Sequence, residues 1–200
     1  MGEKPSIFYC QLDYEHIPYP SPVGAANGNL ANNGCAVCAT SMVAENMLGI
    51  AFPPEESAKL AIACGAREGY GTDLYIYAPV FAKYVGLKVR NTEDGQQALH
   101  FLQEGRGMVI ANTFGDRPER VGLFSDAGHY IVLAEARGSR VKVWDPMYRE
   151  GSGRYDIPGR MGKVILELSK ERDDLEISAG VDYIEPVGDV FSFPTYRSEE

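Results

Sequence analysis

The sequence has little of what several large classes of protein depend on. Its 200 residues include only four cysteines, too few for a disulfide scaffold, so we expect reduced thiols. No apolar run approaches the roughly 18 residues that cross a bilayer, so we expect no membrane-spanning segment. Residues 1–10 contain no apolar core of signal-peptide length. We therefore expect a cytoplasmic protein, or a secreted one if a leader has been removed.

Charge and motif patterns narrow the possible partners. The formal net charge is −9 and no run of basic residues occurs, so we expect neither a nucleic acid nor a membrane as partner. A negative surface favours neutral or basic substrates. The glycine-rich patterns of phosphate-binding loops are missing, and no second C-x-x-C or H-x-x-x-H accompanies Cys35 and Cys38. We therefore expect no cofactor and no metal ion.

What the chain does contain is typical of a globular protein. Hydrophobic residues make up 44% of the sequence, enough for a sizeable core in one domain spanning residues 1–200, with about 186–200 as an extended tail. Helical patterns fill the first half and extended ones the second, which predicts an α+β fold with helices packed on an antiparallel sheet. The predicted helices are 35–48, 53–64, 72–84 and 92–104; the predicted strands are 6–12, 87–90, 107–112, 128–136, 139–145, 163–168 and 181–184.

A cysteine stands at the start of the most apolar of these helices. Asn33 and Gly34 are turn and cap residues, and Cys35 opens the helix, whose composition is apolar on nearly all sides and therefore indicates a buried helix. Backbone N–H groups and the positive end of the dipole favour a thiolate at this position. Cys35 is thus a candidate nucleophile if a base lies nearby.

The candidate base is His129, which begins a predicted strand. A hairpin with the three-residue connection 136–138 would end on Gly138, as a bulged turn prefers. Its register places Glu135 opposite Ser139 and His129 directly opposite Asp145, on the same face of the sheet. The Asp145 carboxylate can then accept the Nδ1–H of the imidazole and stabilise the imidazolium. A slip of one residue would separate the two side chains.

Together, Cys35, His129 and Asp145 form a nucleophile, a base and an orienting group in that chain order. A thiolate that attacks a carbonyl carbon creates an oxyanion, which needs hydrogen-bond donors. The backbone N–H of Cys35 is one candidate donor. The side-chain amide of Gln11, at the end of the first extended segment, is the other. The loops 14–33 and 113–127 are expected to line the cleft.

These segments resemble a known family. They are similar to segments of the bacterial peptidases related to the double-glycine leader peptidases of bacteriocin exporters. The similar segments are Tyr9-Cys10-Gln11-Leu12-Asp13-Tyr14, Asn33-Gly34-Cys35 with the helix that follows, Gly71-Thr72, Gly128-His129-Tyr130 and Trp144-Asp145-Pro146. The resemblance implies a papain-like cysteine peptidase that acts on a peptide or protein substrate, with Cys35 as nucleophile, His129 as base, Asp145 as orienting group and Gln11 as oxyanion donor. The sequence departs from the family in Ala36-Val37-Cys38, where glycine and proline are common.

Other functions stay open at this point. The same triad could serve another acyl-transfer enzyme, of the transglutaminase-like or amide-ligating kind, because the second substrate decides between hydrolysis and transfer. A peptide-binding relative without turnover is also compatible with these residues. Cys35 and Cys38 form a C-x-x-C at a helix start, as in thioredoxin-type redox proteins. A disulfide between them under oxidation is a further hypothesis.

Overall fold

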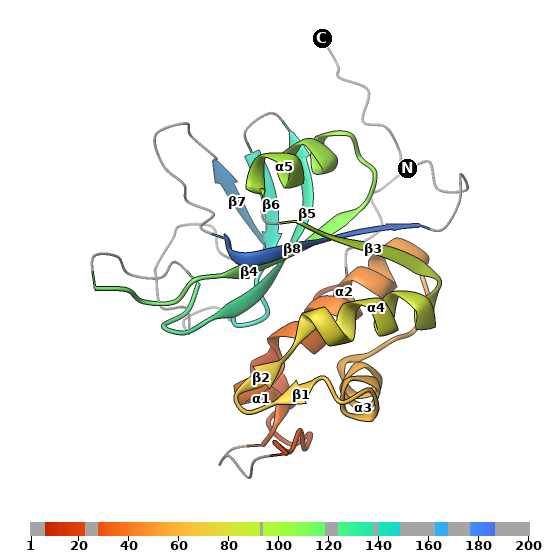
Figure 1. The fold of residues 1–200 in the computed structure, drawn as a ribbon, viewed down its shortest axis with the longest axis vertical. Coiled ribbons are helices and arrows are strands. Elements are labelled where there is room, and N and C mark those ends of the chain that lie inside the picture. The colour runs from red at the N-terminus through yellow and green to blue at the C-terminus, as the bar shows by residue number, and fades with distance from the viewer. Residues whose placement is uncertain are drawn as a thin grey trace.

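The computed structural model describes residues 7–22, 28–92, 94–118, 124–137, 140–148, 163–167 and 177–186. Helices dominate the N-terminal half and strands the C-terminal half (Figure 1), as the sequence predicted. The first elements are the 3-10 helix η1 (Gln11–Tyr14) and the short helix α1 (Leu30–Asn33). The predicted tail, apart from Pro186, lies outside the described residues.

The central helix is α2 (Cys35–Leu48), and both of its predicted ends are confirmed. Gly34 is the N-cap residue, and Gly49 ends the helix with a positive φ of 67°. Eleven of its fourteen residues are buried, which explains its almost uniformly apolar sequence. Helices α3 (Pro54–Ala63) and α4 (Leu74–Val85) pack beside it.

The sheet has six antiparallel strands in the order β3-β8-β4-β5-β6-β7. Their bounds are β3 (Leu87–Thr92), β4 (Met108–Thr113), β5 (His129–Arg137), β6 (Arg140–Trp144), β7 (Lys163–Glu167) and β8 (Ile177–Pro186). The last strand, β8, lies between β3 and β4, whereas the strand that precedes it in the sequence, β7, lies at the opposite edge of the sheet. A small hairpin of β1 (Arg67–Glu68) and β2 (Gly71–Thr72) is separate from this sheet.

The sheet is covered on both faces. Helix α5 (Gly95–Gln103) lies on one side, whereas α2 and α4 lie on the other (Figure 1). The buried side chains form two clusters accordingly. One joins α2, α3 and α4 to residues such as Ile110, Val132 and Trp144, and the other joins α5 to residues such as Val109 and Ile131. The alternation of side chains along β4 and β5 therefore divides the core into two layers.

Some local predictions were wrong. The segment predicted as the strand 6–12 does not pair with the sheet within its described residues, and Gln11 begins η1 instead. The predicted helix 72–84 begins two residues later, at Leu74, because Asp73 caps α4 by accepting a hydrogen bond from the Tyr75 N–H at 2.8 Å. Asp94 similarly caps α5, which starts three residues later than predicted. In both cases an aspartate one or two residues after the predicted helix start accepts hydrogen bonds from free N–H groups of the first turn.

Tyr19, in the loop that precedes α1, contacts the β1–β2 hairpin. The Arg67 guanidinium lies 4.6 Å above the Tyr19 ring and donates from Nε to the Tyr19 carbonyl at 3.0 Å. The Tyr19 hydroxyl lies 2.7 Å from Oγ1 of Thr72 in the β1–β2 hairpin. Burial lowers the pKa of Arg67. These contacts fix the direction in which the chain enters α1 and then α2.

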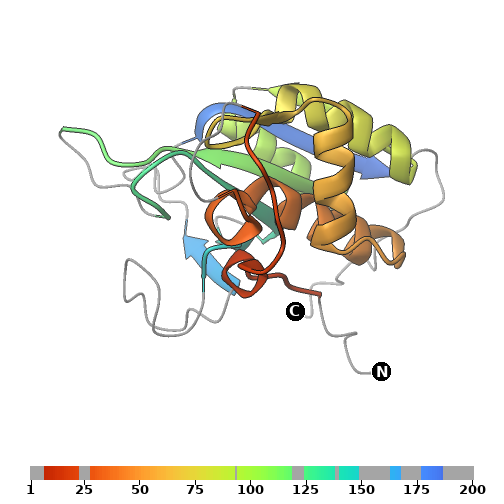
Figure 2. The ribbon, with the colours of Figure 1, turned by 90° about the horizontal axis from the view of Figure 1, so that it is seen from below.

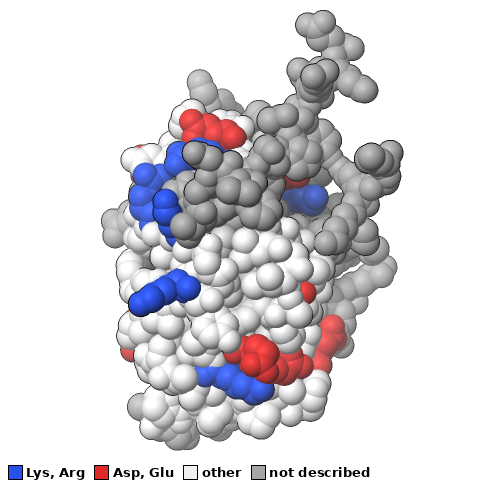
Figure 3. Space-filling model, turned by 90° about the vertical axis from the view of Figure 1, so that its right-hand side faces the viewer, with Lys and Arg blue, Asp and Glu red and all other residues white. Residues whose placement is uncertain are grey.

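The surface seen in Figure 3 carries separate groups of charged side chains with a wide uncharged area between them. Among the described residues on this face, the basic side chains do not form the continuous strip that a nucleic-acid backbone would follow. None of the described helices is both long and apolar enough to span a bilayer.

Candidate active site

Cys35 is held at a tight junction between two helices. Helix α1 ends at Asn33, Gly34 links it to α2, and Cys35 is the first residue of α2. The Asn29 side chain caps α1 by accepting from the Asn32 N–H at 3.1 Å. Cys35 as a residue is partly exposed, while Ala36 and Cys38 are buried. Cys35 therefore lies at the partly exposed end of a largely buried helix.

Gly34 fits this junction because it has no side chain. A Cβ at this position would collide with the carbonyl oxygen of Leu30. We expect Gly34→Ala to lower the free energy of unfolding by about 1–3 kcal/mol, since forcing a methyl into packed backbone displaces α1 from α2. Urea denaturation measures this change. Gly69→Ala is the matched control, because a Cβ at Gly69 would have no neighbour within 4 Å; equal stability of the two variants would contradict the prediction.

His129 begins β5 opposite the last residue of β4. Thr113 pairs with His129 in the sheet, and the Thr113 hydroxyl donates to the His129 carbonyl at 3.0 Å. The imidazole itself is only 2% exposed. Sequence reasoning missed Thr113, because its importance depends on which strand lies beside β5. Thr113 holds the backbone of His129 in place, while the imidazole ring of His129 points to other partners.

The imidazole contacts both of the residues predicted to accompany it. Its Nε2 lies 2.7 Å from Oδ1 of Asp145, which is 3% exposed, and the ring forms a hydrogen bond with the Cys35 thiol. The contact with Asp145 was predicted, but through Nδ1, and that detail was wrong. Because Nε2 faces Asp145, Nδ1 is the ring nitrogen left for Cys35.

Asp145 reaches His129 by a register different from the predicted one. Glu135 pairs with Lys142, three residues beyond its predicted partner Ser139, and an odd shift would put His129 and Asp145 on opposite faces. A bulge between Leu133 and Glu135 absorbs one residue, so that Leu133 pairs with Val143, two residues beyond its predicted partner. The even shift returns both side chains to one face as diagonal neighbours, which are within reach of an imidazole and a carboxylate.

A turn fixes the carboxylate of Asp145. The Met147 N–H donates to the same Oδ1 at 2.8 Å, and the Tyr148 N–H donates to the Asp145 carbonyl at 3.0 Å. The aspartate thus uses its side chain both to close its own turn and to hold the imidazole. Pro146 follows it and accepts a hydrogen bond from the Gln11 N–H at 2.8 Å.

The electrostatics favour an ion pair between Cys35 and His129. Burial alone raises the pKa of the Cys35 thiol, but the hydrogen bond and charge of His129, together with the N–H groups of Tyr130 and Ala36, lower it below its ordinary value. Burial alone lowers the pKa of His129, but hydrogen bonds to Asp145 and Cys35 raise it to about 10. Both shifts favour the form of the pair in which Cys35 is a thiolate and His129 an imidazolium. The N–H of Tyr130 is a contributor that sequence reasoning missed.

We expect the charge of Asp145 to affect the pKa of Cys35 less than the His129 imidazole does. Asp145→Asn keeps an oxygen for the His129 ring and the Met147 N–H but removes the negative charge that raises the pKa of His129. We expect the pKa of Cys35, measured from its alkylation rate against pH, to rise by about 1 unit. Asp126→Asn, at an exposed position, is the control. An unchanged Cys35 pKa in Asp145→Asn would show that the carboxylate charge does not reach the thiol.

Gln11 lies in η1, which packs against α1, and not at the end of an extended segment. The red η1 and the orange-red α1 lie next to each other in Figure 2. The side chain is 2% exposed and its Nε2 donates to the Ala31 carbonyl at 2.7 Å. Its Oε1 is buried without a hydrogen-bond partner among the described residues. One of the two amide hydrogens of Gln11 is thus used in the hydrogen bond to Ala31 of α1, and the Gln11 N–H donates to Pro146 in the turn after Asp145.

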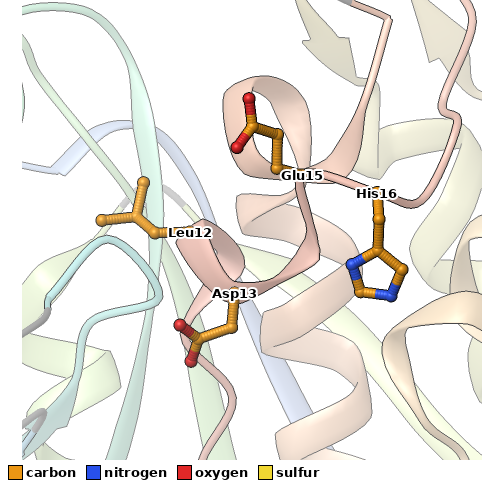
Figure 4. A pocket seen from close by; sticks show the side chains of 4 residues that line it. All are labelled: Leu12, Asp13, Glu15 and His16. Carbon is orange, nitrogen blue, oxygen red and sulfur yellow. The ribbon is translucent and has the colours of Figure 1, made fainter.

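The remaining histidines lie apart from this arrangement. His100 is in α5 and faces Glu104 at 3.1 Å. His16 borders a shallow pocket with Leu12, Asp13 and Glu15, but their side chains point in different directions from η1 (Figure 4). These four side chains therefore do not converge on a common point. Within the described part of the chain, no group of three or more His, Cys, Asp or Glu side chains is arranged to hold a metal ion.

Comparison with known proteins identifies the fold. No family model and no curated protein sequence matches this chain. The peptidase domain of Streptococcus ComA, a bi-functional ABC transporter involved in a quorum sensing pathway, is similar with a TM-score of 0.53 and 15% identity, over 78% of this chain and 93% of that domain. A double glycine motif protease from an AMS/PCAT transporter, solved in complex with the leader peptide, gives a TM-score of 0.48 and 16% identity over 76% and 84%.

At this level of identity the likeness concerns the fold and not the activity. The predicted fold class is confirmed by the sheet covered by α2 on one face and by the similarity to the ComA domain. The chain therefore has the papain-like α+β fold of the peptidase domain of Streptococcus ComA.

Proposed function

We propose that this protein is a cysteine peptidase that cleaves a peptide or isopeptide bond through Cys35, His129 and Asp145. The observation that carries the proposal is the buried imidazole of His129, which contacts the Cys35 thiol on one side and Asp145 at 2.7 Å on the other. A cysteine paired with a charged imidazole at a helix start is the arrangement of an activated sulfur nucleophile. The peptidase fold gives this arrangement a precedent.

In the proposed reaction the Cys35 thiolate attacks the carbonyl carbon of the substrate. The His129 imidazolium then gives its proton to the leaving amine, and a thioester between Cys35 and the acyl group remains. Neutral His129 next removes a proton from water, and the resulting attack releases the acid and restores the thiolate. Asp145 keeps the ring oriented and its charged form stable in both steps.

Two donors are proposed for the oxyanion. The N–H of Cys35 lies in the first turn of α2, where the dipole favours negative charge. The second donor is the amide of Gln11, whose Nε2 uses one hydrogen for the Ala31 carbonyl and has another for the substrate oxygen. The bonds of Gln11 to Ala31 and Pro146 hold this amide rigidly between the segment before Cys35 and the turn after Asp145. Such fixed donors stabilise a developing negative charge without reorganisation.

The substrate class that we propose is a peptide or protein segment. The net charge of −9 disfavours strongly acidic substrates, and the related protease from an AMS/PCAT transporter is described in complex with a leader peptide. We therefore include peptides with a double-glycine sequence among the first to be tested. The cleft is proposed to lie between α2 and the beginning of β5.

The test is cleavage of a pool of synthetic peptides by the purified full-length chain. We expect new peptide ends by mass spectrometry, and a thioester adduct on Cys35 when the reaction is quenched in acid. The adduct and the cleavage should both be missing in Cys35→Ala. Adding a primary amine separates hydrolysis from transfer, because a transferase would give amide products. Rapid alkylation of Cys35 without any adduct or product from the pool would overturn the proposal of acyl chemistry.

A further inference from the structure

A second cysteine lies next to the proposed nucleophile and has no part in the proposed reaction. Cys38 follows Cys35 by three residues on α2 and is fully buried. Burial raises the pKa of its thiol well above the ordinary value, and the charges of Cys35 and Cys10 raise it further. Cys38 is therefore a protonated thiol at neutral pH, one helical turn from Cys35.

We propose that Cys38 is a resolving cysteine, which captures Cys35 as a disulfide when Cys35 is oxidised and thereby protects the nucleophile from irreversible damage. The proposal concerns regulation of the same site and rests on the reactive Cys35 of the proposed function. The pair would form a modification site with one accessible and one inaccessible member.

The geometry of the first helical turn allows this bond. Residues three apart on a helix have Cβ atoms about 5–6 Å apart, and a disulfide needs about 3.5–4.5 Å, so an approach of about 1–2 Å is required. Cys35 can make this movement because it is the first residue of α2 and follows Gly34 directly. The hydrogen bond from the Cys38 N–H to the Gly34 carbonyl, 2.9 Å long, can keep Cys38 in place while Cys35 turns toward it.

The accessibility of the two sulfurs sets the order of events. Cys35 is partly exposed and its thiolate is stabilised by His129, so a peroxide reacts there first. Cys38 is buried and protonated, so it is protected from direct oxidation. The same burial keeps it beside the sulfenic acid that forms on Cys35, where water and small thiols have less access.

The chemistry balances with hydrogen peroxide as oxidant. The Cys35 thiolate takes one oxygen from the peroxide and becomes a sulfenic acid, and hydroxide leaves. Oxidation removes the negative charge of Cys35, which is one of the causes of the raised pKa of Cys38. The Cys38 sulfur then attacks the Cys35 sulfur; its proton and the displaced hydroxyl group leave as water, and the disulfide remains. A dithiol reductant returns both cysteines to thiols.

Cys10 is the competing partner. It is buried, it lies directly before Gln11, and its charge also acts on Cys38. It belongs to a different segment, however, whose next residue Gln11 is held to α1 through the Ala31 carbonyl. A bond between Cys35 and Cys38 closes a loop within a single turn of α2 and leaves these contacts intact.

The test treats the reduced full-length protein with hydrogen peroxide, blocks free thiols with iodoacetamide and maps the cysteines by peptide mass spectrometry. We expect a Cys35–Cys38 disulfide in the wild type and in Cys10→Ala. After dithiothreitol, we expect about tenfold more alkylatable Cys35 in the wild type than in Cys38→Ala, where Cys35 proceeds to sulfinic acid. Cys64→Ala is the matched control and should behave as the wild type. Cys38→Val, checked by circular dichroism, replaces Cys38→Ala if the latter does not fold.

The outcomes separate this proposal from the proposed function because the test measures mass and not cleavage. A Cys35–Cys38 disulfide in a protein without peptidase activity supports the resolving role and rejects only the peptidase. A Cys10–Cys35 disulfide, direct sulfinic acid at Cys35 in the wild type, or an unoxidised Cys35 would each overturn the resolving role, whatever the activity.

Discussion

Replacing Cys35 by alanine is expected to lower the rate of peptide cleavage by about 10⁴-fold or more, because no other group can form the acyl intermediate. Cys38 cannot substitute for it, since it is fully buried and its pKa is raised by burial and by the charges of Cys35 and Cys10. The measurement is the rate of product formation from the best peptide of the pool, followed by mass spectrometry at equal enzyme concentrations.

The same substitution should leave the fold intact. The Cys35 side chain is partly exposed, and α2 is held by its buried residues and not by the thiol. His129 keeps its contact with Asp145 at 2.7 Å. The melting temperature of Cys35→Ala should therefore stay within about 3 °C of the wild type, a change of about 1 kcal/mol. Cys64→Ala, at a half-buried position after α3, is the control for loss of a thiol. Full activity in Cys35→Ala would end the proposal.

Replacing His129 by alanine is expected to have the second-largest effect, and it can be measured without a substrate. In the wild type His129 lowers the pKa of Cys35, so iodoacetamide should alkylate Cys35 rapidly even below pH 7. Without the imidazole, burial dominates and the pKa rises above its ordinary value. Each unit of pKa changes the thiolate fraction tenfold at lower pH, so we expect the rate at pH 6 to fall about 100-fold or more.

The pH profile distinguishes this effect from a general loss of structure. Alkylation is followed from pH 4 to 9, and peptide mapping separates Cys35 from Cys38. In His129→Ala the rate should increase with pH over the whole alkaline range, whereas the wild-type rate should reach its plateau earlier. His100→Ala, on the exposed face of α5, is the control. The same profile in the wild type and in His129→Ala would mean that the N–H groups of Tyr130 and Ala36 alone hold the thiolate, and the redox function would gain support.

The helices show what short-range sequence patterns can predict. The bounds of α2 follow from Gly34, Gly49 and the apolar residues between them, and α3 starts at Pro54, one residue after its predicted start, with Glu55 and Glu56 in its first turn. These signals act within one or two turns of the chain. The errors at α4 and α5 are also local, since Asp73 and Asp94, which cap these helices, lie one and two residues after the predicted helix starts.

The contacts of the candidate site show what local sequence patterns do not predict. The sequence identified His129 and Asp145 as partners, but through a hairpin register that the structure does not have. The contact survives because a bulge in β5 changes the shift from three residues to two. The position of a bulge depends on packing of both sheet faces, which a local pattern does not contain. Similarly, β8 reaches a central place between β3 and β4 although its sequence signal was weak.

The sequence by itself determined the α+β class, the start of α2 at Cys35 and the identity of the residues proposed for catalysis, because residue types and spacing carry that information. Only the tertiary structure decided that Nε2 of His129 faces Asp145, that Gln11 bridges Ala31 and Pro146, and that Tyr130 and Thr113 support Cys35 and His129. These contacts join residues far apart in the chain, and their geometry depends on strand order and register, which arise from the packing of the whole core.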